Sequence, residues 1–399
     1  MIRGRREIIL VLIIVTAFST SLKAQLNAIQ TAVPFLTIAP DSRSGGMGDI
    51  GAATSPDVSS QHWNSAKFAF MDGNGGVGLS YSPWLRNLIG DINLAYLAGY
   101  YRIDQRQVIS ASLVYFSLGD ITFTDIYGNT TMNFNPNEFA IDVGYSRAFS
   151  EYISGGMVFR YIYSNLTGGQ TVGGAETKPG HSVAADVSTY YNHPISISGM
   201  GGNAGFGVNI SNIGMKISYT DDQDPDFIPT NLRIGGVFQL DIDEFNSIGF
   251  HADINKLLVP TPPLYYQPGD TLPSGDLVQN GDQIIEAGMD PNVSVPVGMF
   301  QSFYDAPGGF KEEMQEIAFS IGLEYWYNKV FAIRGGYFHE NENKGNRKFF
   351  TVGLGLKLNI FSLDFAYLIP IQHNHPLSNT LRFSLAFDFD SAGKINASQ

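Results

Sequence analysis

The histidines are the residues with the most evident potential for chemistry, and there are seven of them in 399 residues. Only His373 and His375 lie close together, and no acidic residue stands beside them. A zinc site takes about four ligands from histidine, cysteine and carboxylate side chains, and the chain has no cysteine. We therefore predict no metal site, and disulfide and thiol chemistry are excluded.

Two further patterns with chemical potential are Ser44 and the glycine-rich stretch Gly45–Gly51. A phosphate-binding loop would need a Gly-Lys-Ser or Gly-Lys-Thr sequence between a strand and a helix, and this stretch has no such sequence. A nucleophile elbow would need glycines two residues before and after the serine, which Ser44 lacks. The sequence therefore predicts no catalytic residue and no cofactor, and we expect a protein that is not an enzyme.

The segment that contains this stretch, Pro34–Phe70, is better explained by packing than by catalysis. It is rich in glycine and poor in large apolar residues, and a long series of alternating strands follows it. Such a compact, irregular segment ahead of many strands predicts a hatch or plug inside a barrel, which we assign to residues 25–75. Its glycines are expected where the backbone packs so close to the wall that a Cβ would not fit. The residues with a structural role in this hatch are Gly46, Gly48, Gly51, Trp63 and Asn64.

Residues 1–24 have the features of a secretory signal peptide. Three arginines precede the apolar run Ile8–Phe18, and Leu22-Lys23-Ala24 is suitable for cleavage, so the mature chain is expected to begin at Gln25. The apolar run is shorter than the ~20 residues of a transmembrane helix. We therefore expect an exported protein.

Composition restricts the class of exported protein. The mature chain has a formal charge of −16, because the signal peptide holds four of the 24 basic residues and one of the 37 acidic residues. A chain this acidic is not expected to bind nucleic acid, which requires basic patches. No later apolar run reaches the ~18 residues that would span a membrane as a helix. The remaining classes are a secreted β-sandwich and a transmembrane β-barrel.

The strand pattern favours the barrel. In the last predicted strand, leucine and phenylalanine occupy every second position from Leu381 to Phe389, and the residues between them are polar or small. Such strands face two different media, and most reach the ~10 residues that a tilted strand needs to cross a bilayer. The predicted strands are 76–82, 91–103, 107–118, 137–149, 152–164, 180–192, 203–213, 230–240, 246–257, 316–327, 330–339, 347–358, 361–370 and 379–389.

The connections between these strands alternate between short turns, such as Ser150-Glu151, and longer loops, such as 119–136. Outer-membrane barrels have an even number of strands, short periplasmic turns and longer extracellular loops. We therefore predict an all-β, 14-stranded antiparallel transmembrane β-barrel over residues 76–389, located in the cell outer membrane. The hatch and the tail 390–399 are both expected on the periplasmic side. The link His193–Gly202 is expected to be one of the turns.

Charged residues within the predicted strands are expected to line a polar lumen. Opposite charges there should pair with each other and with the hatch, as in any barrel of this size, rather than mark a pore. The residues concerned are Asp142, Arg160, Asp253, Glu324, Arg334, Asp364 and Arg382.

The longest loop, 258–315, is the main candidate for recognition. Its eight prolines exclude one continuous helix or strand, and a short helical turn is expected at Lys311–Gln315. Its aromatic and methionine side chains are of the kind found at binding hot spots and adaptable surfaces. The alternative is a lid that folds over the barrel mouth. The candidate partner-binding residues are Val297, Met299, Phe300, Phe303 and Tyr304.

Several of these stretches together resemble a known family. Gly46–Ala53, followed by Asn64-Ser65-Ala66, is similar to the hatch of the long-chain fatty-acid transporter superfamily of barrels, with Ser65 in place of the proline of that family. More closely, nearly the whole mature chain resembles the PorV family, outer-membrane barrels of the type IX secretion system; the paralogous PorQ family shares the hatch. The resemblance rests on Ala39–Arg43, Gln61–Asn64, Asp305–Glu313, Glu324–Tyr327, Arg334–Phe338 and Asn379–Phe383.

The resemblance implies a role in protein secretion without enzymatic activity. Barrels of this family are expected to bind the C-terminal signal domain of cargo that leaves the type IX translocon, and to deliver it to the sortase and attachment complex at the cell surface. The implied surroundings are outer-membrane lipids and lipopolysaccharide. The alternative function is an uptake channel for long-chain fatty acids or another hydrophobic substrate.

Overall fold

The computed structural model describes residues 27–85, 90–124, 127–172, 175–221, 224–372 and 375–389. The predicted signal peptide, His373 and the predicted tail 390–399 lie outside the described residues. Among the residues that are described, no helix is both long and apolar enough to cross a membrane.

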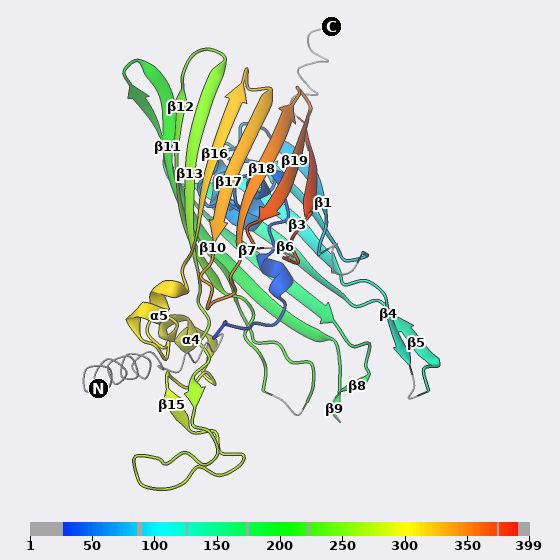
Figure 1. Cartoon of the computed structure of the whole chain (residues 1–399). Coiled ribbons are helices and arrows are strands. Elements are labelled where there is room, and N and C mark those ends of the chain that lie inside the picture. Colours follow the sequence, from blue (N-terminus) through cyan, green and yellow to red (C-terminus); the bar gives the residue numbers. More distant parts are fainter. Residues whose placement is uncertain are drawn as a thin grey trace, which may run out of the picture.

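Fourteen antiparallel strands form one closed barrel, because β1 pairs with β20 as well as with β2 (Figure 1). This confirms the predicted all-β fold and its number of strands, and outside β10 and β11 the predicted boundaries agree within two residues. The barrel strands are β1 (Gly75–Pro83), β2 (Asn93–Arg102), β3 (Gln107–Ser117), β6 (Asn137–Ala148), β7 (Ile153–Asn165), β10 (Gly180–Ile197), β11 (Met200–Gly214), β12 (Asn231–Asp241), β13 (Asn246–Leu257), β16 (Ala318–Tyr327), β17 (Phe331–His339), β18 (Lys348–Lys357), β19 (Phe361–Pro370) and β20 (Leu381–Asp388).

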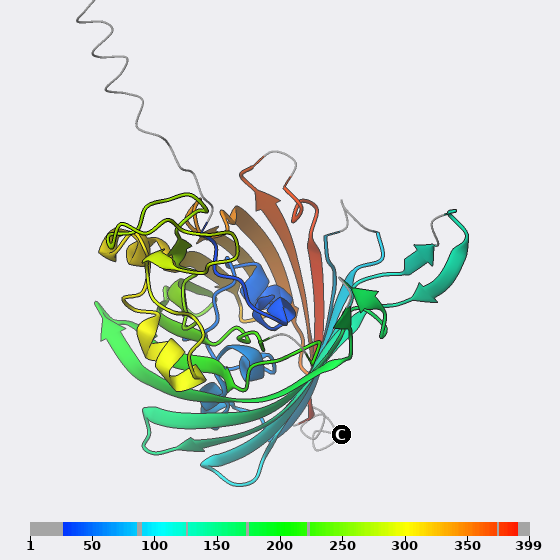
Figure 2. The ribbon, with the colours of Figure 1, turned by 90° about the horizontal axis from the view of Figure 1, so that it is seen from below.

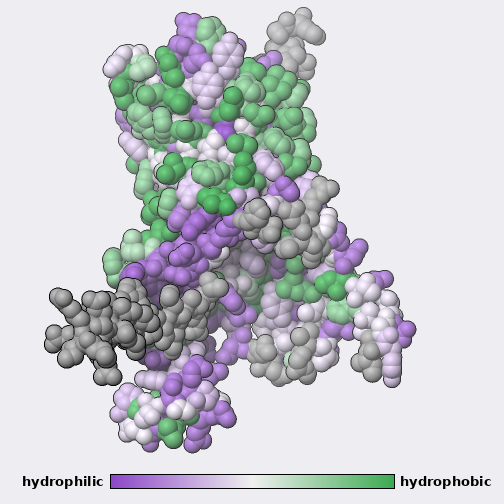
Figure 3. All heavy atoms as spheres, viewed as in Figure 1, coloured by the Kyte–Doolittle hydropathy of each residue, from purple (hydrophilic) through white to green (hydrophobic). Residues whose placement is uncertain are grey.

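Apolar side chains cover the outside of the barrel wall. In β3, for example, Ile109, Leu113 and Tyr115 are exposed, while Ser110, Ser112 and Val114 face inward and are buried. Successive side chains of a strand point to opposite sides. On the face seen in Figure 3, the exposed positions of the strands form a largely apolar surface above the more polar loops. Such a surface is what a barrel presents to the hydrocarbon of a bilayer.

The prediction for residues 193–202 was wrong, because β10 and β11 continue through this stretch and are joined by Ser198 and Gly199 alone. Both residues have positive φ angles, 52° and 85°. Two-residue turns with positive φ at both positions match the twist of antiparallel strands, and a Ser-Gly pair is suited to them. Glycines in the strand itself concealed its length.

The longer connections lie at the opposite end of the barrel and contain short elements of their own (Figure 1). Three small hairpins project there, and the loop between β13 and β16 also contains two helices. The predicted helical turn at 311–315 is confirmed as α5. These elements are β4 (Ile121–Thr124), β5 (Thr130–Phe134), β8 (Thr171–Val172), β9 (Ala175–Glu176), β14 (Leu264–Tyr265), β15 (Ile285–Ala287), α4 (Val295–Gln301) and α5 (Phe310–Gln315).

Residues 27–74, which we call the N-terminal segment, lie within the ring of strands (Figure 2). Their short elements are η1 (Pro34–Thr37), α2 (Ser42–Gly45), α3 (Ser60–Trp63) and η2 (Ser65–Phe70). An apolar cluster joins this segment to the inner wall: Phe35 stacks on Phe116 of β3, with 6.3 Å between ring centroids. Farther along, Phe68 stacks on Tyr100 of β2 at 5.5 Å.

The N-terminal segment begins at the long-loop end of the barrel, which corrects the expectation that it lies with the chain ends on the short-turn side. The Asn27 side-chain amide donates to the carbonyl oxygen of Pro262 at 3.1 Å and to the Glu312 carboxylate at 2.9 Å, and both acceptors belong to the longest loop. The segment then runs through the barrel to β1, which starts at the short-turn end. An even number of strands fixes where the wall starts and ends, but it does not fix where a segment before the wall begins.

This course predicts that Gln30 is accessible from the cell surface. Gln30 is exposed and the chain has no cysteine, so a Gln30→Cys variant carries a single thiol. We expect a membrane-impermeant maleimide to label it on intact cells. A Glu244→Cys variant, in the short turn between β12 and β13, should be labelled only after the outer membrane is permeabilised. Labelling of both thiols only after permeabilisation would contradict the course described here.

Candidate partner-binding surface

The glycines assigned to the hatch differ in what they contact. A Cβ on Gly48, whose φ is 78°, would lie 2.9 Å from the backbone of Tyr337 in β17. A Cβ on Gly46 would lie 3.0 Å from the Cα of Gly353 in β18. A Cβ on Gly51 would meet the Trp63 ring, at 2.3 Å, and not the wall. Two of the three glycines therefore allow close approach to the wall, and the third allows the segment to fold on itself.

Polar groups of the N-terminal segment bond to the inner wall on several sides. The Asp253 carboxylate of β13 accepts from the backbone N–H groups of Gly51 and Ala52 at 2.8 and 3.0 Å. The Asn64 side-chain amide donates to the carbonyl oxygens of Ala52 and of Thr189 in β10. The backbone groups of Gly51 and Ala52, which belong to no helix or strand, are thereby satisfied, as buried polar groups require.

The charged residues predicted to line the lumen pair with each other and with the N-terminal segment, as expected. Glu324 of β16 binds Arg43 of the segment at 3.0 Å and Arg334 of β17 at 2.8 Å. Arg334 also binds Asp364, at 2.6 Å. The other pairs join Arg160 to Asp142 and Asp186, Arg233 to Asp253, and Arg382 to Asp49.

A cavity of about 320 Å³ remains between the N-terminal segment and the wall, on the side of the long loops. Its lining is rich in charge and includes Asp49, Arg233, Glu316, Glu340 and Arg347. A site for an apolar ligand is lined mainly by apolar and aromatic side chains. The lining also includes apolar residues such as Leu36, Leu257 and Phe338, so it is the charged part that does not suit a hydrophobic substrate.

The longest loop is held on the barrel rim by a buried network of lysines and glutamates. The Lys256 ammonium, at the end of β13, lies 3.1 Å from the Glu313 carboxylate and 2.6 Å from that of Glu316. Lys344, from the loop between β17 and β18, binds Glu312 and Glu316 at 2.5 and 3.0 Å. The network fixes α5 against two different strand ends. No pattern along the chain indicates this network, because its residues come from the end of β13 and from two separate loops.

The stretch Asp305–Glu313 helps to build this platform. Asp305 accepts from the backbone N–H of Thr261 at 3.1 Å, and Glu313 accepts from that of Ala306 at 2.8 Å. Burial raises the pKa of Asp305 to about 6, and the nearby carboxylates of Glu313 and Glu316 act in the same direction. The family resemblance that this stretch carries thus concerns the support of the loop more than its exposed surface.

Most of the predicted partner-binding residues are exposed on α4 and the turn after it. Val297, Phe300 and Tyr304 are 51, 73 and 64% exposed, and their spacing of three and four residues places them on one face. Phe303 is 48% exposed, while Met299 is only partly so. The opposite face of α4 is fixed, since Gly298 is packed against Phe227 and Pro260.

The sequence interpretation missed two members of this surface. Phe310 and Met314 lie four residues apart on α5 and are 80 and 52% exposed. They were overlooked because the motif around them is dominated by glycine and charge. We use the name α4–α5 surface for the set of six residues: Val297, Phe300, Phe303, Tyr304, Phe310 and Met314.

No metal centre emerges from the described residues, in which no three histidine, cysteine or carboxylate side chains come together as possible ligands. His375 uses its Nδ1 to accept from the backbone N–H of Leu377 at 3.1 Å, which is a turn contact.

Comparison with solved structures returns outer-membrane barrels at low sequence identity. The toluene transporter TbuX of Ralstonia pickettii is 12% identical, with 91% of this chain and 98% of that chain covered and a TM-score of 0.45. The toluene transporter TodX of Pseudomonas putida is 13% identical, with coverage of 86% and 96% and a TM-score of 0.47. A FadL homologue of Pseudomonas aeruginosa is 11% identical, with coverage of 91% and 99% and a TM-score of 0.46. A comparison with curated proteins found no match.

A family model described as type IX secretion system protein PorV matches residues 21–264, which is more than half of the chain. The match includes the N-terminal segment and the barrel strands from β1 to β13. Together with the closed barrel and its apolar outer wall, this match places the protein in the outer membrane. The chain belongs to the PorV family of type IX secretion system proteins.

Proposed function

We propose that this protein binds the C-terminal signal domain of secreted cargo as it leaves the type IX translocon, and delivers it to the sortase and attachment complex at the cell surface. Family membership supports the secretion role. In this proposal the protein acts by binding and carries out no reaction itself.

The observation that supports this proposal best is the α4–α5 surface. Large apolar side chains that are exposed to water are an aggregation liability unless a partner covers them. Here they stand on helices that a buried ionic network and the packing of Gly298 hold in place. A surface that is rigid before binding loses less entropy when the partner docks. Its position on the extracellular loop is where cargo that leaves a translocon would be met.

We further propose that the N-terminal segment is a plug that keeps the lumen closed. The support is its many bonds to the wall, from Glu324 on one side to Thr189 on the other. With a closed lumen, cargo would be carried on the outside of the barrel and would not pass through it. The plug would then be a structural part of the barrel and not a gate.

The uptake channel is the second candidate, and the charged residues that line the cavity do not support it. A hydrophobic substrate would have to cross a space lined by Asp49, Arg233, Glu316 and Arg347. It would displace water from these charged groups without offering them hydrogen bonds, which is costly. We therefore favour binding of a protein partner over transport of an apolar molecule.

The test of the proposed function replaces Phe300, Phe303 and Tyr304 with serine. The variant should still reach the outer membrane, because these side chains are exposed. Phe303 also lies under the Lys256 ammonium, 5.8 Å from its ring centroid, but Lys256 keeps its ion pairs with Glu313 and Glu316 without it. We expect cargo to accumulate with its signal domain uncleaved, and copurification of cargo or translocon to fall at least tenfold, because interface aromatics of this kind typically contribute ~2 kcal/mol or more each. The measurements are immunoblotting of cell fractions and pull-down of the tagged barrel.

The matched control makes the same kind of change elsewhere in the same loop. Tyr265, Leu277 and Met289 are also exposed, and their replacement with serine should leave secretion normal. Normal display of cargo at the surface of cells with the Phe300, Phe303 and Tyr304 variant would contradict the proposal. Loss of fatty-acid uptake with secretion intact would favour the channel.

A further inference from the structure

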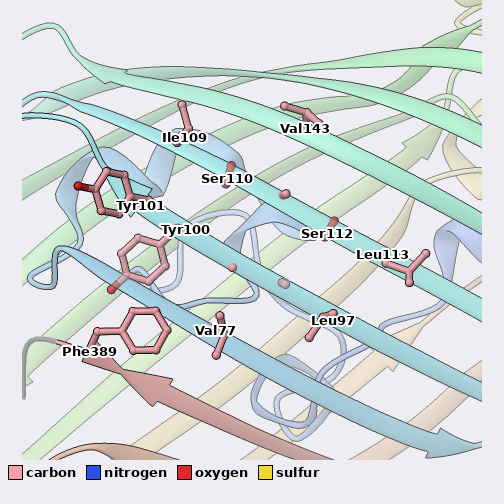
Figure 4. Close-up of a pocket in the computed structure, with 14 residues that line it drawn as sticks. Val77, Leu97, Tyr100, Tyr101, Ile109, Ser110, Ser112, Leu113, Val143 and Phe389 are labelled. Atoms are coloured by element: carbon pink, nitrogen blue, oxygen red, sulfur yellow. The ribbon is translucent and has the colours of Figure 1, made fainter. Parts of the chain in front are cut away.

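A hollow of about 670 Å³ lies in the outer, lipid-facing wall of the barrel (Figure 4). Its floor is formed by Gly99 of β2 and Ala111 of β3, which are directly paired. Both positions point outward, because Leu97 and Leu113, two residues away on the same strands, are exposed. Among neighbours that are large and apolar, this pair of small residues leaves unfilled space.

Apolar side chains surround the floor on all sides. Val77 of β1 is paired with Gly99, and Val143 of β6 is paired with Ala111. Across β2 and β3 the hollow is bounded by the pair Leu97 and Leu113 and by the pair Tyr101 and Ile109. The shape and chemistry suit a hydrocarbon chain.

Two exposed arginines stand at the short-turn end of the same strands. Arg106 lies in the turn between β2 and β3, and Arg147 lies on β6 opposite Gln107. Within the described part of the chain, neither guanidinium is part of an ion pair. Arg147 is four residues from Val143 on the outward face, which corresponds to ~13 Å along the strand.

The acidic residue of that turn does not neutralise the arginines by direct contact. The Asp104 carboxylate accepts from the backbone N–H groups of Arg106 and Gln107 and from the Gln107 side-chain amide. Its hydrogen-bonding capacity is therefore used within the turn itself. The turn between β12 and β13, by contrast, has acidic residues at 241, 243 and 244 and no basic one.

We propose that the hollow and the two arginines form a binding site for one anionic phospholipid of the periplasmic leaflet. An acyl chain would lie over Gly99 and Ala111, and the phosphate would accept from Arg106 and Arg147. Because lipid tails surround the whole wall, the hydrophobic effect does not select this place. The selection comes from close packing in the hollow and from the basic headgroup site, since planar guanidinium groups bind phosphate with two donors.

The test measures lipid retained by the purified full-length mature barrel in detergent, by native mass spectrometry with added phosphatidylglycerol or phosphatidylethanolamine. We expect one phosphatidylglycerol per barrel to be retained in preference. Ala111→Phe fills the hollow from the lipid side and should reduce that bound fraction several-fold. Arg106→Gln with Arg147→Gln should remove the preference for the anionic lipid. The expected loss in relative retention of that lipid is about fivefold for each arginine, the usual contribution of one basic residue near an anionic membrane surface.

Two control variants make the same changes elsewhere on the wall. Ala252→Phe alters an outward alanine of β13, and Lys329→Gln with Lys357→Gln removes two exposed charges at other short turns. Both controls should retain phosphatidylglycerol as the unmodified protein does. Heat-modifiability on gels verifies that each variant is folded. Equal retention by Ala111→Phe and Ala252→Phe, or an unchanged lipid preference in the double arginine variant, would overturn the proposal.

Discussion

Glu324→Ala is expected to lower the free energy of unfolding of the barrel by about 3–5 kcal/mol, the usual cost of removing one partner from a buried ion pair. The Glu324 side chain is 4% exposed and binds Arg43 and Arg334 together. Without it, positive charge from the N-terminal segment and from β17 remains in the barrel interior with too little compensation. Urea unfolding of the purified protein in detergent would measure the loss.

Two comparisons separate charge from simple loss of a side chain. Glu340→Ala removes the partner of Arg347, which is 46% exposed, and should cost at most ~1 kcal/mol. Combining Glu324→Ala with Arg43→Ala should restore part of the stability, because Arg334 retains Asp364. If adding Arg43→Ala lowers the stability as much as Arg43→Ala does alone, the ion pair between Arg43 and Glu324 does not explain the loss in Glu324→Ala.

Gly48→Val is expected to destabilise the barrel by a similar amount. A valine there would have a positive φ, which costs roughly 1–3 kcal/mol for a residue with a Cβ. Its Cβ would also lie 2.9 Å from the Tyr337 backbone, and overpacking of this kind costs ~1–3 kcal/mol more. We expect the folded band on gels to be lost at a lower temperature, and the yield of folded barrel to fall.

Gly128→Val is the matched control for this change. Gly128 has nearly the same conformation, with a φ of 83°, but nothing lies within 4 Å of a Cβ built on it. This variant therefore carries the conformational cost without the contact with the wall. If the two variants lose stability equally, close packing of the N-terminal segment against β17 contributes nothing.

The wall of the barrel could be predicted from the sequence because its physical cause is local. Each strand separates lipid from a polar interior, so the apolar and polar residues between Leu381 and Phe389 alternate with a period of two. The alternation of short turns and long loops also indicated which connections lie at the same end of the barrel. The error at 193–202 arose where small residues replace the alternation, and where the two-residue turn at Ser198 carries the information instead.

The α4–α5 surface could be predicted only in part. The apolar residues of the long loop stood out as composition, but the helix α4 that presents Val297 and Phe300, and the turn after it that carries Tyr304, did not. Nothing in the sequence near Lys256 or Lys344 indicates that both bind Glu316. Contacts between separate loops depend on how the barrel brings strand ends together, and no periodicity along the chain records that arrangement.

The contacts of the N-terminal segment with β20 have a consequence for the order of assembly. The backbone N–H of Ser42 donates to the Ser384 hydroxyl at 2.8 Å, although the two residues are 342 positions apart, and Asp49 pairs with Arg382 of the same strand. Residues synthesised first therefore wait for those synthesised last before their buried polar groups are satisfied. Contacts of such long sequence separation form slowly. In a chain that lacks β20, the Ser42 backbone N–H and the Asp49 carboxylate would have no partner on that strand. A truncation at the C-terminus would therefore be detectable in the N-terminal segment.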